Sequence, residues 1–403
     1  MQEVETLIIG AGVIGSSLAM SLAELGMGGI RVIDFDLEGS FSSSELNAGG
    51  VRATWAEPIN IQMSKLSIEY FAAHATEVGY RPCGYLWLHS PERLPGALKA
   101  RERQVAAGWP VETWDLPELR KRVPFLDKTE GVAAAFFAPR DGLVNPNLLK
   151  KHFRQKAREK GVIFDDRTFL QQVEYARDGS SAILATARRW ESVLPETLKQ
   201  EILVAGEKES SGLVKYRARR IVNCAGPWAC RVASILGYTT PSVPLRRQVC
   251  IFDCRDVDLT PYGMIVDTSG VYFHPEATNG LAGFASHGEK PGFNFSYDGE
   301  SFFMDVIWPA LYERSTVFER LKHVTGWAGL YEVSPDESAI LGPVKSNVFE
   351  AHSFSGHGVM QSYAAGLLLA ERIMTGKYQT LDGEVFSGHR FETGQFVRES
   401  LVI

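Results

Sequence analysis

The amino-acid sequence predicts an α/β fold of two domains, on three observations. The chain has 403 residues, of which 45% are hydrophobic and 22% charged, as in an ordinary globular protein. At roughly 100–200 residues a domain, this length predicts two or three domains. An aliphatic run, a glycine-rich turn and a helical pattern follow one another within residues 6–25, whereas several strand-like runs fill residues 237–325.

The N-terminal segment has the order strand, glycine turn and helix that binds dinucleotides. Thr6–Ile9 is β-branched and aliphatic, and the motif Gly10-x-Gly12-x-x-Gly15 follows it at once. In such a Rossmann-type unit the first glycine makes a tight turn, the second lets a pyrophosphate approach the backbone, and the third lets helix and strand pack closely. The unpaired N–H groups at the start of the helix favour phosphate.

An acidic residue narrows the choice of dinucleotide. A second strand, Ile30–Ile33, ends at Asp34, 19 residues after Gly15. A carboxylate at this position accepts hydrogen bonds from an adenosine ribose and disfavours a 2′-phosphate. The motif therefore predicts NAD or FAD rather than NADP.

Two further segments favour a flavin. Residues 42–52, SSSELNAGGVR, are mostly small, which permits close backbone contact with a large flat ligand, although a plain surface loop is the alternative. A second glycine-rich loop, Gly356-His-Gly358, leads into an apolar helix more than 300 residues after the first. An isoalloxazine ring gains negative charge on reduction, and the N-terminus of a helix suits that charge.

With these segments in place, the chain resembles the D-amino-acid-oxidase-type FAD-dependent oxidoreductases. Within that family it resembles the branch of sarcosine oxidase, dimethylglycine dehydrogenase and dye-linked proline dehydrogenase. The resemblance spans nearly the whole chain and rests on the segments above together with Asn223-Cys-Ala-Gly-Pro-Trp228 and Trp327-Ala-Gly-Leu-Tyr-Glu-Val-Ser-Pro-Asp336.

The resemblance implies a Rossmann-type FAD-binding domain and a discontinuous antiparallel-sheet substrate domain of α+β character. We expect residues 1–80, 143–236 and 326–403 in the FAD-binding domain, and residues 81–142 and 237–325 in the substrate domain. The polar stretch 175–218 is expected to form a β-meander.

The cofactor-binding residues are predicted from the motifs and from the resemblance. Covalent family members attach FAD near Ser43-Ser44-Glu45 or near Gly329-Leu330-Tyr331, and neither neighbourhood holds a suitable nucleophile here, so FAD is expected to be non-covalent. The predicted set is Gly10, Gly12, Val13, Ile14, Gly15, Asp34, Phe35, Ser43, Ser44, Asn47, Ala48, Gly49, Gly50, Val51, Leu170, Cys224, Ala225, Gly226, Trp228, Gly329, Gly356, His357, Gly358, Val359 and Met360.

Three residues are expected to act on the substrate, each with a structural alternative. The resemblance implies that Arg52 holds a substrate carboxylate, for which a planar and permanently charged guanidinium is suited. An ion pair with a nearby acid such as Glu57 is the alternative. His287 matches the family's active-site histidine, which would tune the charge of the amine or of the reduced ring. Tyr331 matches a tyrosine that lines the pocket. A loop histidine and a core aromatic are the alternatives.

The sequence departs from monomeric sarcosine oxidase at positions that bear charge. Met360 stands where that enzyme has a lysine that binds carboxylate, and Gly280–Ser286 contains no lysine to activate oxygen. Gly49 stands where that enzyme has an arginine. These departures favour a dehydrogenase that passes electrons to a carrier, such as an electron-acceptor protein, over an oxidase, which stays an alternative.

The predicted function is oxidation of an amine or amino acid, whether secondary, N-methylated, cyclic or of the D series. The hydride on the carbon next to nitrogen would pass to flavin N5, and the imine would hydrolyse in water. Two alternatives stay open. The segment around Arg52 also resembles FAD proteins that assist assembly of respiratory complex I without catalysis, and the same residues would suit oxidation of a 2-hydroxy acid. The absence of GxSxG and HExxH motifs argues against a hydrolase.

Charge and composition set the remaining expectations. The formal charge of 42 − 48 = −6 predicts no general affinity for nucleic acid. No run of apolar residues reaches the length of a membrane span, and no basic segment precedes the first strand, so a cytoplasmic location is expected. The five cysteines are scattered and predict neither a metal site nor a disulfide framework.

Overall fold

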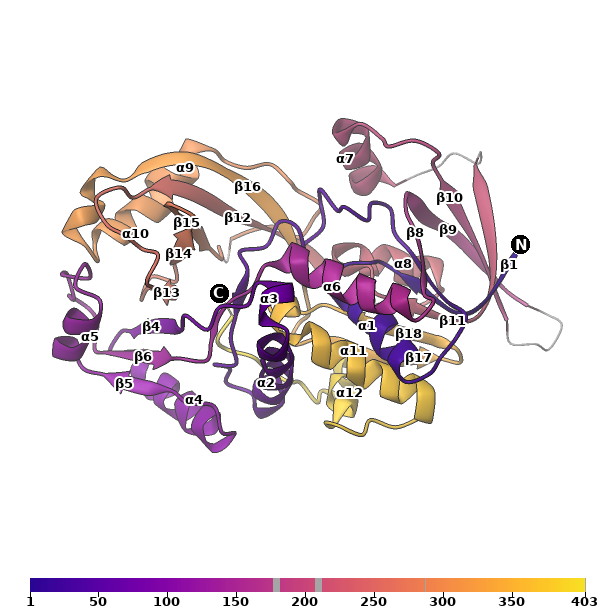
Figure 1. Ribbon diagram of the computed structural model, residues 1–403, viewed down its shortest axis with the longest axis horizontal. Helices are drawn as coiled ribbons and strands as arrows, with labels where there is room; N and C mark the ends of the chain where they lie inside the picture. Colours follow the sequence, from indigo (N-terminus) through magenta and orange to yellow (C-terminus); the bar gives the residue numbers. More distant parts are fainter. Residues whose placement is uncertain (177–181, 207–211, 287, 403) are drawn as a thin grey trace.

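The computed structural model describes residues 1–176, 182–206, 212–286 and 288–402. The chain forms two lobes, each built around an eight-stranded sheet (Figure 1). This architecture confirms the predicted fold class.

The first sheet contains the N-terminal strand at its centre. Its order is β17-β18-β11-β1-β2-β8, and β10 and β9 extend it from β11. The strands from β18 to β8 run parallel to their neighbours, whereas β9, β10 and β17 pair antiparallel. The strands are β1 (Gln2–Ile9), β2 (Ile30–Ile33), β8 (Ile163–Asp165), β9 (Thr168–Tyr175), β10 (Ile183–Arg189), β11 (Leu213–Asn223), β17 (Ile340–Lys345) and β18 (Val348–His352).

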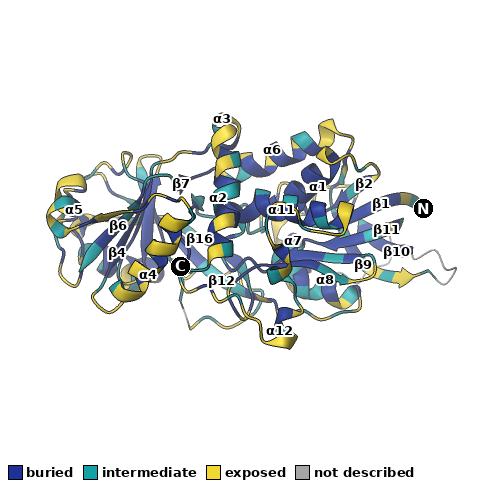
Figure 2. Ribbon diagram, turned by 90° about the horizontal axis from the view of Figure 1, so that it is seen from below, coloured by how far each residue is buried: buried dark blue, intermediate teal, exposed yellow. Residues whose placement is uncertain are grey.

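Three helices pack together beside this sheet. Helix α1 (Val13–Glu24) lies between α11 (Gly358–Thr375) and α6 (Pro146–Glu159) (Figure 1). Eleven of the twelve residues of α1 are buried, so the helix is covered on every side rather than on one face (Figure 2). The small residues Ser17 and Gly366 let α1 and α11 approach, because a Cβ at Gly366 would lie 2.3 Å from Ser17 Oγ.

The second sheet is built from both insertions and from one later strand. Its order is β16-β12-β15-β14-β13-β4-β6-β5, with every neighbouring pair antiparallel except β13 and β4. The predicted domain boundary at residue 326 falls inside β16, which pairs along its length with β12. The strands are β4 (Tyr85–His89), β5 (Glu112–Trp114), β6 (Ala134–Ala138), β12 (Val243–Asp253), β13 (Met264–Val266), β14 (Tyr272–Glu276), β15 (Asn279–Phe284) and β16 (Lys322–Val333).

The remaining elements are short or lie around the two sheets. The polar stretch 175–218 contains strands β10 and β11, but helix α7 stands between them where only strands were expected. Strands β3 (Gly50–Val51) and β7 (Gly142–Leu143) form a separate pair. The further helices are α2 (Pro58–Ala73), α3 (Ala75–Val78), α4 (Leu94–Ala106), α5 (Leu116–Arg122), α7 (Glu196–Ala205), α8 (Ala229–Ile235), α9 (Glu300–Phe302), α10 (Trp308–Tyr312) and α12 (Arg390–Thr393).

Every helix in the described part of the chain is too short or too polar to span a membrane.

Replacing Gly15 by alanine should lower the free energy of unfolding. A Cβ at Gly15 would lie 2.0 Å from the carbonyl oxygen of Gly10, and neither backbone can move without separating α1 from β1. We expect a loss of about 1–3 kcal/mol, as for other overpacked sites, measured by urea unfolding. The control is Gly96→Ala in α4, where a Cβ would meet nothing within 4 Å. Equal stability of the Gly15 variant and the wild type would contradict this packing role.

Candidate functional site

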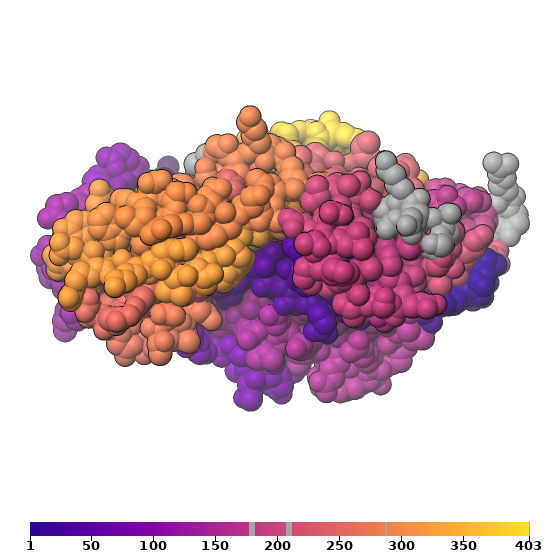
Figure 3. Space-filling model, turned by 90° about the horizontal axis from the view of Figure 1, so that it is seen from above, coloured from indigo at the N-terminus to yellow at the C-terminus, as the bar shows by residue number. Residues whose placement is uncertain are grey.

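A large cavity is lined by residues from both lobes and from both ends of the chain. Its lining runs in sequence from Ile9 to Val402. In the space-filling view a part of the chain coloured indigo to purple, from its first quarter, shows in the seam between the two lobes (Figure 3). The cavity is therefore formed only when segments more than 300 residues apart have packed.

The glycine turn after β1 forms one end of the cavity. Gly10 has a φ of +102°, and a Cβ there would lie 2.3 Å from the carbonyl oxygen of Cys224 at the end of β11. A Cβ at Gly12 would meet only Ser44 Oγ, at 3.2 Å, so the backbone at Gly12 is open to the cavity. Val13 N–H donates to Ser44 Oγ at 3.1 Å. This exposed turn at the start of a helix fits a pyrophosphate.

Asp34 joins the glycine turn to the end of β2. Its Oδ2 accepts a hydrogen bond from Ala11 N–H at 2.5 Å, and its Oδ1 accepts one from Asp36 N–H at 2.8 Å. Burial raises the pKa of Asp34, opposed by these two bonds and by Arg154 and Lys150. The carboxylate lines the cavity beside Phe35 and Leu170, where an adenosine would lie.

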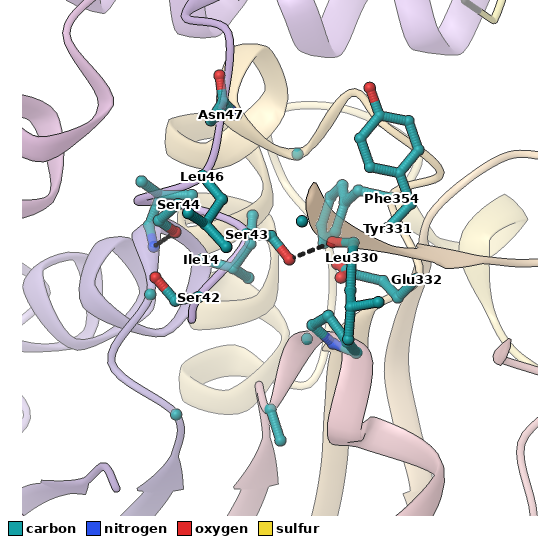
Figure 4. A pocket seen from close by; sticks show the side chains of 18 of the residues that line it. Ile14, Ser42, Ser43, Ser44, Leu46, Asn47, Leu330, Tyr331, Glu332 and Phe354 are labelled. Carbon is teal, nitrogen blue, oxygen red and sulfur yellow. Dashed lines mark hydrogen bonds between the residues drawn. The ribbon is translucent and has the colours of Figure 1, made fainter. Parts of the chain in front are cut away.

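Residues 42–52, the serine-rich segment, are joined to β16 of the second sheet by hydrogen bonds. Ser43 Oγ donates to Leu330 O at 2.6 Å (Figure 4), and Trp327 Nε1 donates to Leu46 O at 3.1 Å. Within the segment, Asn47 Oδ1 accepts the N–H of Gly49 at 2.5 Å. These bonds join the segment directly to β16, and residues of both line the cavity.

Two backbone surfaces can hold the cofactor, and they are called cradles. The first is the glycine turn after β1, and the second is the glycine loop at the start of α11. Gly356 has a φ of +96°, and a Cβ there would lie 2.4 Å from the ring of Tyr331, so only glycine fits. Gly358, Val359 and Met360, the first residues of α11, line the cavity. Two helix N-termini and two glycine loops therefore face one cavity, an arrangement that fits a dinucleotide with an added ring system.

The structure places most of the predicted cofactor residues together. The cavity lining includes Gly10, Gly12, Val13, Ile14, Asp34, Phe35, Ser43, Ser44, Asn47, Ala48, Gly50, Leu170, Cys224, Ala225, Gly226, Trp228, Gly329, Gly356, Gly358, Val359 and Met360. Arg52 and Tyr331 line it as well. His287 lies outside the described residues.

Four predicted residues do not line the cavity, for identifiable reasons. Gly15 packs against Gly10, and a Cβ at Gly49 would lie 2.6 Å from the carbonyl oxygen of Val144. Val51 is buried in the β3–β7 pair. The buried ring of His357 is used structurally: Nδ1 bonds with Gln361 Oε1 at 3.0 Å and Nε2 with Glu337 O at 2.8 Å.

Arg52 is a buried cation at the cavity wall. It is 2% exposed, and its guanidinium carbon lies 3.5 Å from the ring centroid of Trp55. Its Nη1 donates to Thr54 O at 2.8 Å and its Nη2 donates to Leu401 O. Burial lowers its pKa to about 10, so it stays charged at neutral pH. Among described residues it has no ion pair.

Glu57, the alternative ion-pair partner that the sequence suggested for Arg52, does not contact it. Glu57 is paired with Arg103, at 3.9 Å, on the exposed side of the molecule. Tyr85, Glu399 and Asp141 raise the pKa of Arg52 by Coulomb interaction, without a direct ion pair.

Asp141 fixes the backbone that follows Arg52. Its oxygens accept hydrogen bonds from Ala53 N–H at 2.8 Å, Thr54 Oγ1 at 3.0 Å and Trp109 Nε1 at 2.8 Å. Burial raises the pKa of Asp141 to about 7, opposed by these bonds and by the charge of Arg52. A fully buried carboxyl group therefore holds the strand end that carries the arginine.

The segment 397–402 closes the cavity beside Arg52. The buried Glu399 carboxylate accepts hydrogen bonds from Ala56 N–H at 3.0 Å, from Asn60 Nδ2 at 3.2 Å and from Leu401 N–H at 3.0 Å. These bonds hold Leu401 O against Arg52, and Val402 lines the cavity.

Sequence reasoning missed several residues of the lining from the second sheet. Tyr85 on β4, Arg247 on β12 and Tyr272 on β14 face the cavity, as does Glu332 on β16. Burial raises the pKa of both Tyr85 and Tyr272, so their hydroxyls stay protonated and can donate hydrogen bonds. Alternation along each strand was the available signal, but it does not say which face meets the cavity.

A family model described as FAD dependent oxidoreductase matches residues 5–372. Among curated proteins, the FAD-dependent oxidoreductase domain-containing protein 1 of Xenopus laevis is 29% identical, over 97% of this chain and 83% of its own length. The mitochondrial dimethylglycine dehydrogenase of Rattus norvegicus is 24% identical, over 93% of this chain and 43% of its own length.

A solved structure agrees with the fold. The L-proline dehydrogenase of P. horikoshii superimposes with a TM-score of 0.82 at 23% sequence identity, covering 98% of this chain and 99% of that one. The family match and the two cradles together assign FAD as the cofactor.

Replacing Gly12 by alanine should weaken FAD binding and leave the fold intact. A Cβ at Gly12 would require only a small shift of the Ser44 side chain, 3.2 Å away, but it occupies the side on which the pyrophosphate approaches. We expect the dissociation constant of FAD to rise about 100-fold, measured by recovery of flavin fluorescence on dilution. Thermal unfolding of the apoprotein, compared with Gly96→Ala, should be unchanged. Unaltered FAD affinity would contradict the assigned position of the phosphates.

Asp141 should make stability depend on pH. Its folded-state pKa, about 7, lies above the ordinary value of 3.8. Its contribution is therefore fully present below about pH 4 and is lost as pH rises through about 7. The unfolding free energy of wild type relative to Asp141→Asn should fall between pH 4 and pH 8, measured by urea unfolding, with the exposed Asp305→Asn as control. A difference that stays constant with pH would contradict the raised pKa.

Proposed function

The chain belongs to the FAD-dependent oxidoreductase family, and we propose that it oxidises an amino acid at the bond between nitrogen and the neighbouring carbon. The class includes secondary, N-methylated, cyclic and D-amino acids. The relatives support this class, since dimethylglycine and proline, the compounds in their names, both carry an alkylated nitrogen beside a carboxylate.

The observation that carries this proposal is the charge of Arg52. A buried cation without an ion pair is costly, and an anion that enters the cavity offsets that cost. Two donors of Arg52 are bonded to backbone carbonyls, Thr54 O and Leu401 O, which fix the plane of the guanidinium. The remaining N–H groups can bind a carboxylate, and the fixed plane gives that carboxylate one orientation.

The residues of the chain supply binding and orientation. Arg52 holds the carboxylate, and the protonated hydroxyls of Tyr85 and Tyr331 stand beside it as hydrogen-bond donors. The second sheet and segment 397–402 cover the substrate end of the cavity and exclude water. Bound FAD would supply the acceptor for the hydride that leaves the carbon next to nitrogen. The imine product hydrolyses after release.

A dehydrogenase is favoured over an oxidase within this proposal. The described lining of the cavity contains arginines but no lysine, and Met360 lies where the resemblance to sarcosine oxidase places one. Electrons would then pass to a carrier, which the family's dehydrogenases imply.

Arg52→Ala should retain bound FAD and lose flavin reduction by amino acids. Removing the carboxylate ligand should lower the rate of flavin bleaching about 100-fold or more under anaerobic mixing with N-methylated, cyclic and D-amino acids. Arg52→Lys should recover part of the rate, and Arg219→Ala, an exposed arginine on β11, serves as the control.

Each alternative function predicts a different result in the same experiment. An unchanged rate in Arg52→Ala would overturn the assigned role. Bleaching of the wild-type flavin by a 2-hydroxy acid, faster than by its amino analogue, would favour oxidation of hydroxy acids. A flavin that no amine or hydroxy acid reduces would favour a role through a protein partner.

A further inference from the structure

Strand β12 presents two neighbouring arginines to opposite faces of the second sheet. Arg246 faces outward, where its guanidinium bonds with Glu289 at 2.6 Å and Asp298 at 2.8 Å. Arg247 and Val249 face the cavity. Glu289 and Asp298 therefore neutralise Arg246 on the face of the sheet that Arg247 does not share.

Arg247 has few partners of its own. Its Nη1 donates to the carbonyl oxygen of Arg246 at 3.1 Å, while its buried Nε–H has no acceptor. Its guanidinium carbon lies 5.2 Å from the ring centroid of Tyr331. Across the described part of the chain no carboxylate forms an ion pair with it. A buried donor that lies in a cavity wall without a protein acceptor is available to a ligand.

Glu332, which follows Tyr331 and also lines the cavity, does not neutralise Arg247. Burial raises the pKa of Glu332 to about 7, and only backbone hydrogen bonds, from Phe354 and from its own N–H, oppose this shift. Glu332 and Arg247 both line the cavity, and no ion pair joins these two described residues.

Arg52 and Arg247 are two distinct cations around Tyr331. Both oppose the rise in the pKa of the Tyr331 hydroxyl that burial causes. They come from different segments, the loop after β3 and strand β12, and neither has a carboxylate partner in the residues described. A carboxylate bound to Arg52 still leaves the Nε–H of Arg247 available to a second anionic group.

We propose that Arg247 binds a second anionic group of the substrate, so that the substrate is an amino acid with an additional carboxylate on its side chain or its nitrogen substituent. This inference rests on the proposed function, which assigns the first carboxylate to Arg52. Arg247 determines specificity: it selects for the second charge, whereas Arg52 binds the group common to all amino acids.

The test compares acids with their neutral amides of nearly equal shape. N-methylaspartate is paired with N-methylasparagine, and N-methylglutamate with N-methylglutamine, in both enantiomers, by anaerobic flavin reduction of the holoprotein. We expect the better acid to exceed its amide about 100-fold in rate constant over dissociation constant, as for loss of a charge-assisted bidentate contact. In Arg247→Gln the ratio should fall to about 3 or less, through the acid alone, and Arg247→Lys should keep part of it.

Two further measurements separate binding of the substrate from an effect on the cofactor. The dissociation constant and the reduction potential of FAD should be the same in Arg247→Gln and wild type. Thiodiacetate, which has sulfur in place of the amine, should perturb the flavin spectrum of wild type at lower concentration than methylthioacetate does. That difference should disappear in Arg247→Gln.

The outcomes that overturn the inference differ from those that overturn the proposed function. Reduction by proline or sarcosine, with no preference for either acid over its amide, refutes the second anionic group and leaves amino-acid oxidation standing. An equal loss for acids and amides in Arg247→Gln, or a shifted flavin potential, refutes the assigned role of Arg247. If no amine of either kind reduces the flavin, the proposed function itself fails.

Discussion

The contact between Gly15 and the carbonyl group of Gly10 sets the position of everything that surrounds the cofactor. The start of α1 rests directly on the turn after β1, with no side chain between them, and the same turn lies against Cys224 at the end of β11. Helix α1 in turn carries α11, whose first residues form the second cradle. A shift of this contact would move both ends of the FAD site together.

The shape of the cavity also depends on strand β16, which makes hydrogen bonds in both lobes. Strand β16 belongs to the second sheet through its pairing with β12, yet it holds the serine-rich segment of the FAD site through Leu330. The wall that faces the substrate and the wall that faces the cofactor are therefore parts of one hydrogen-bonded unit. This coupling explains why the chain departs from a simple division into consecutive domains.

Two arginines, the buried Arg52 and the partly buried Arg247, determine the electrostatics at the substrate end of the cavity. Among the described residues, no acid forms an ion pair with either of them. Arg52 and Arg247 lie among tyrosine and tryptophan rings, which accommodate a guanidinium through cation–π contact but do not cancel its charge. Asp141 lies close enough to stabilise Arg52, but its own carboxyl group is bonded to the backbone and to Trp109. The positive charge is left for a ligand, which is the property from which both the proposed reaction and the proposed substrate class were inferred.

The sequence by itself determined the fold class, the FAD motif and the identity of the two cradles, because each is a local pattern of glycines and small residues next to a strand or helix. It could not place helix α7 inside the polar stretch 175–218, since that segment shows no clear period. It also could not distinguish Gly49 and His357, which pack inside the protein, from neighbours that line the cavity. The tertiary structure alone decided that Arg247 faces inward while Arg246 faces outward, and that Leu401 meets Arg52 across 349 positions. The physical reason is that which face of a strand is buried, and which distant segment covers it, depends on how the two sheets pack.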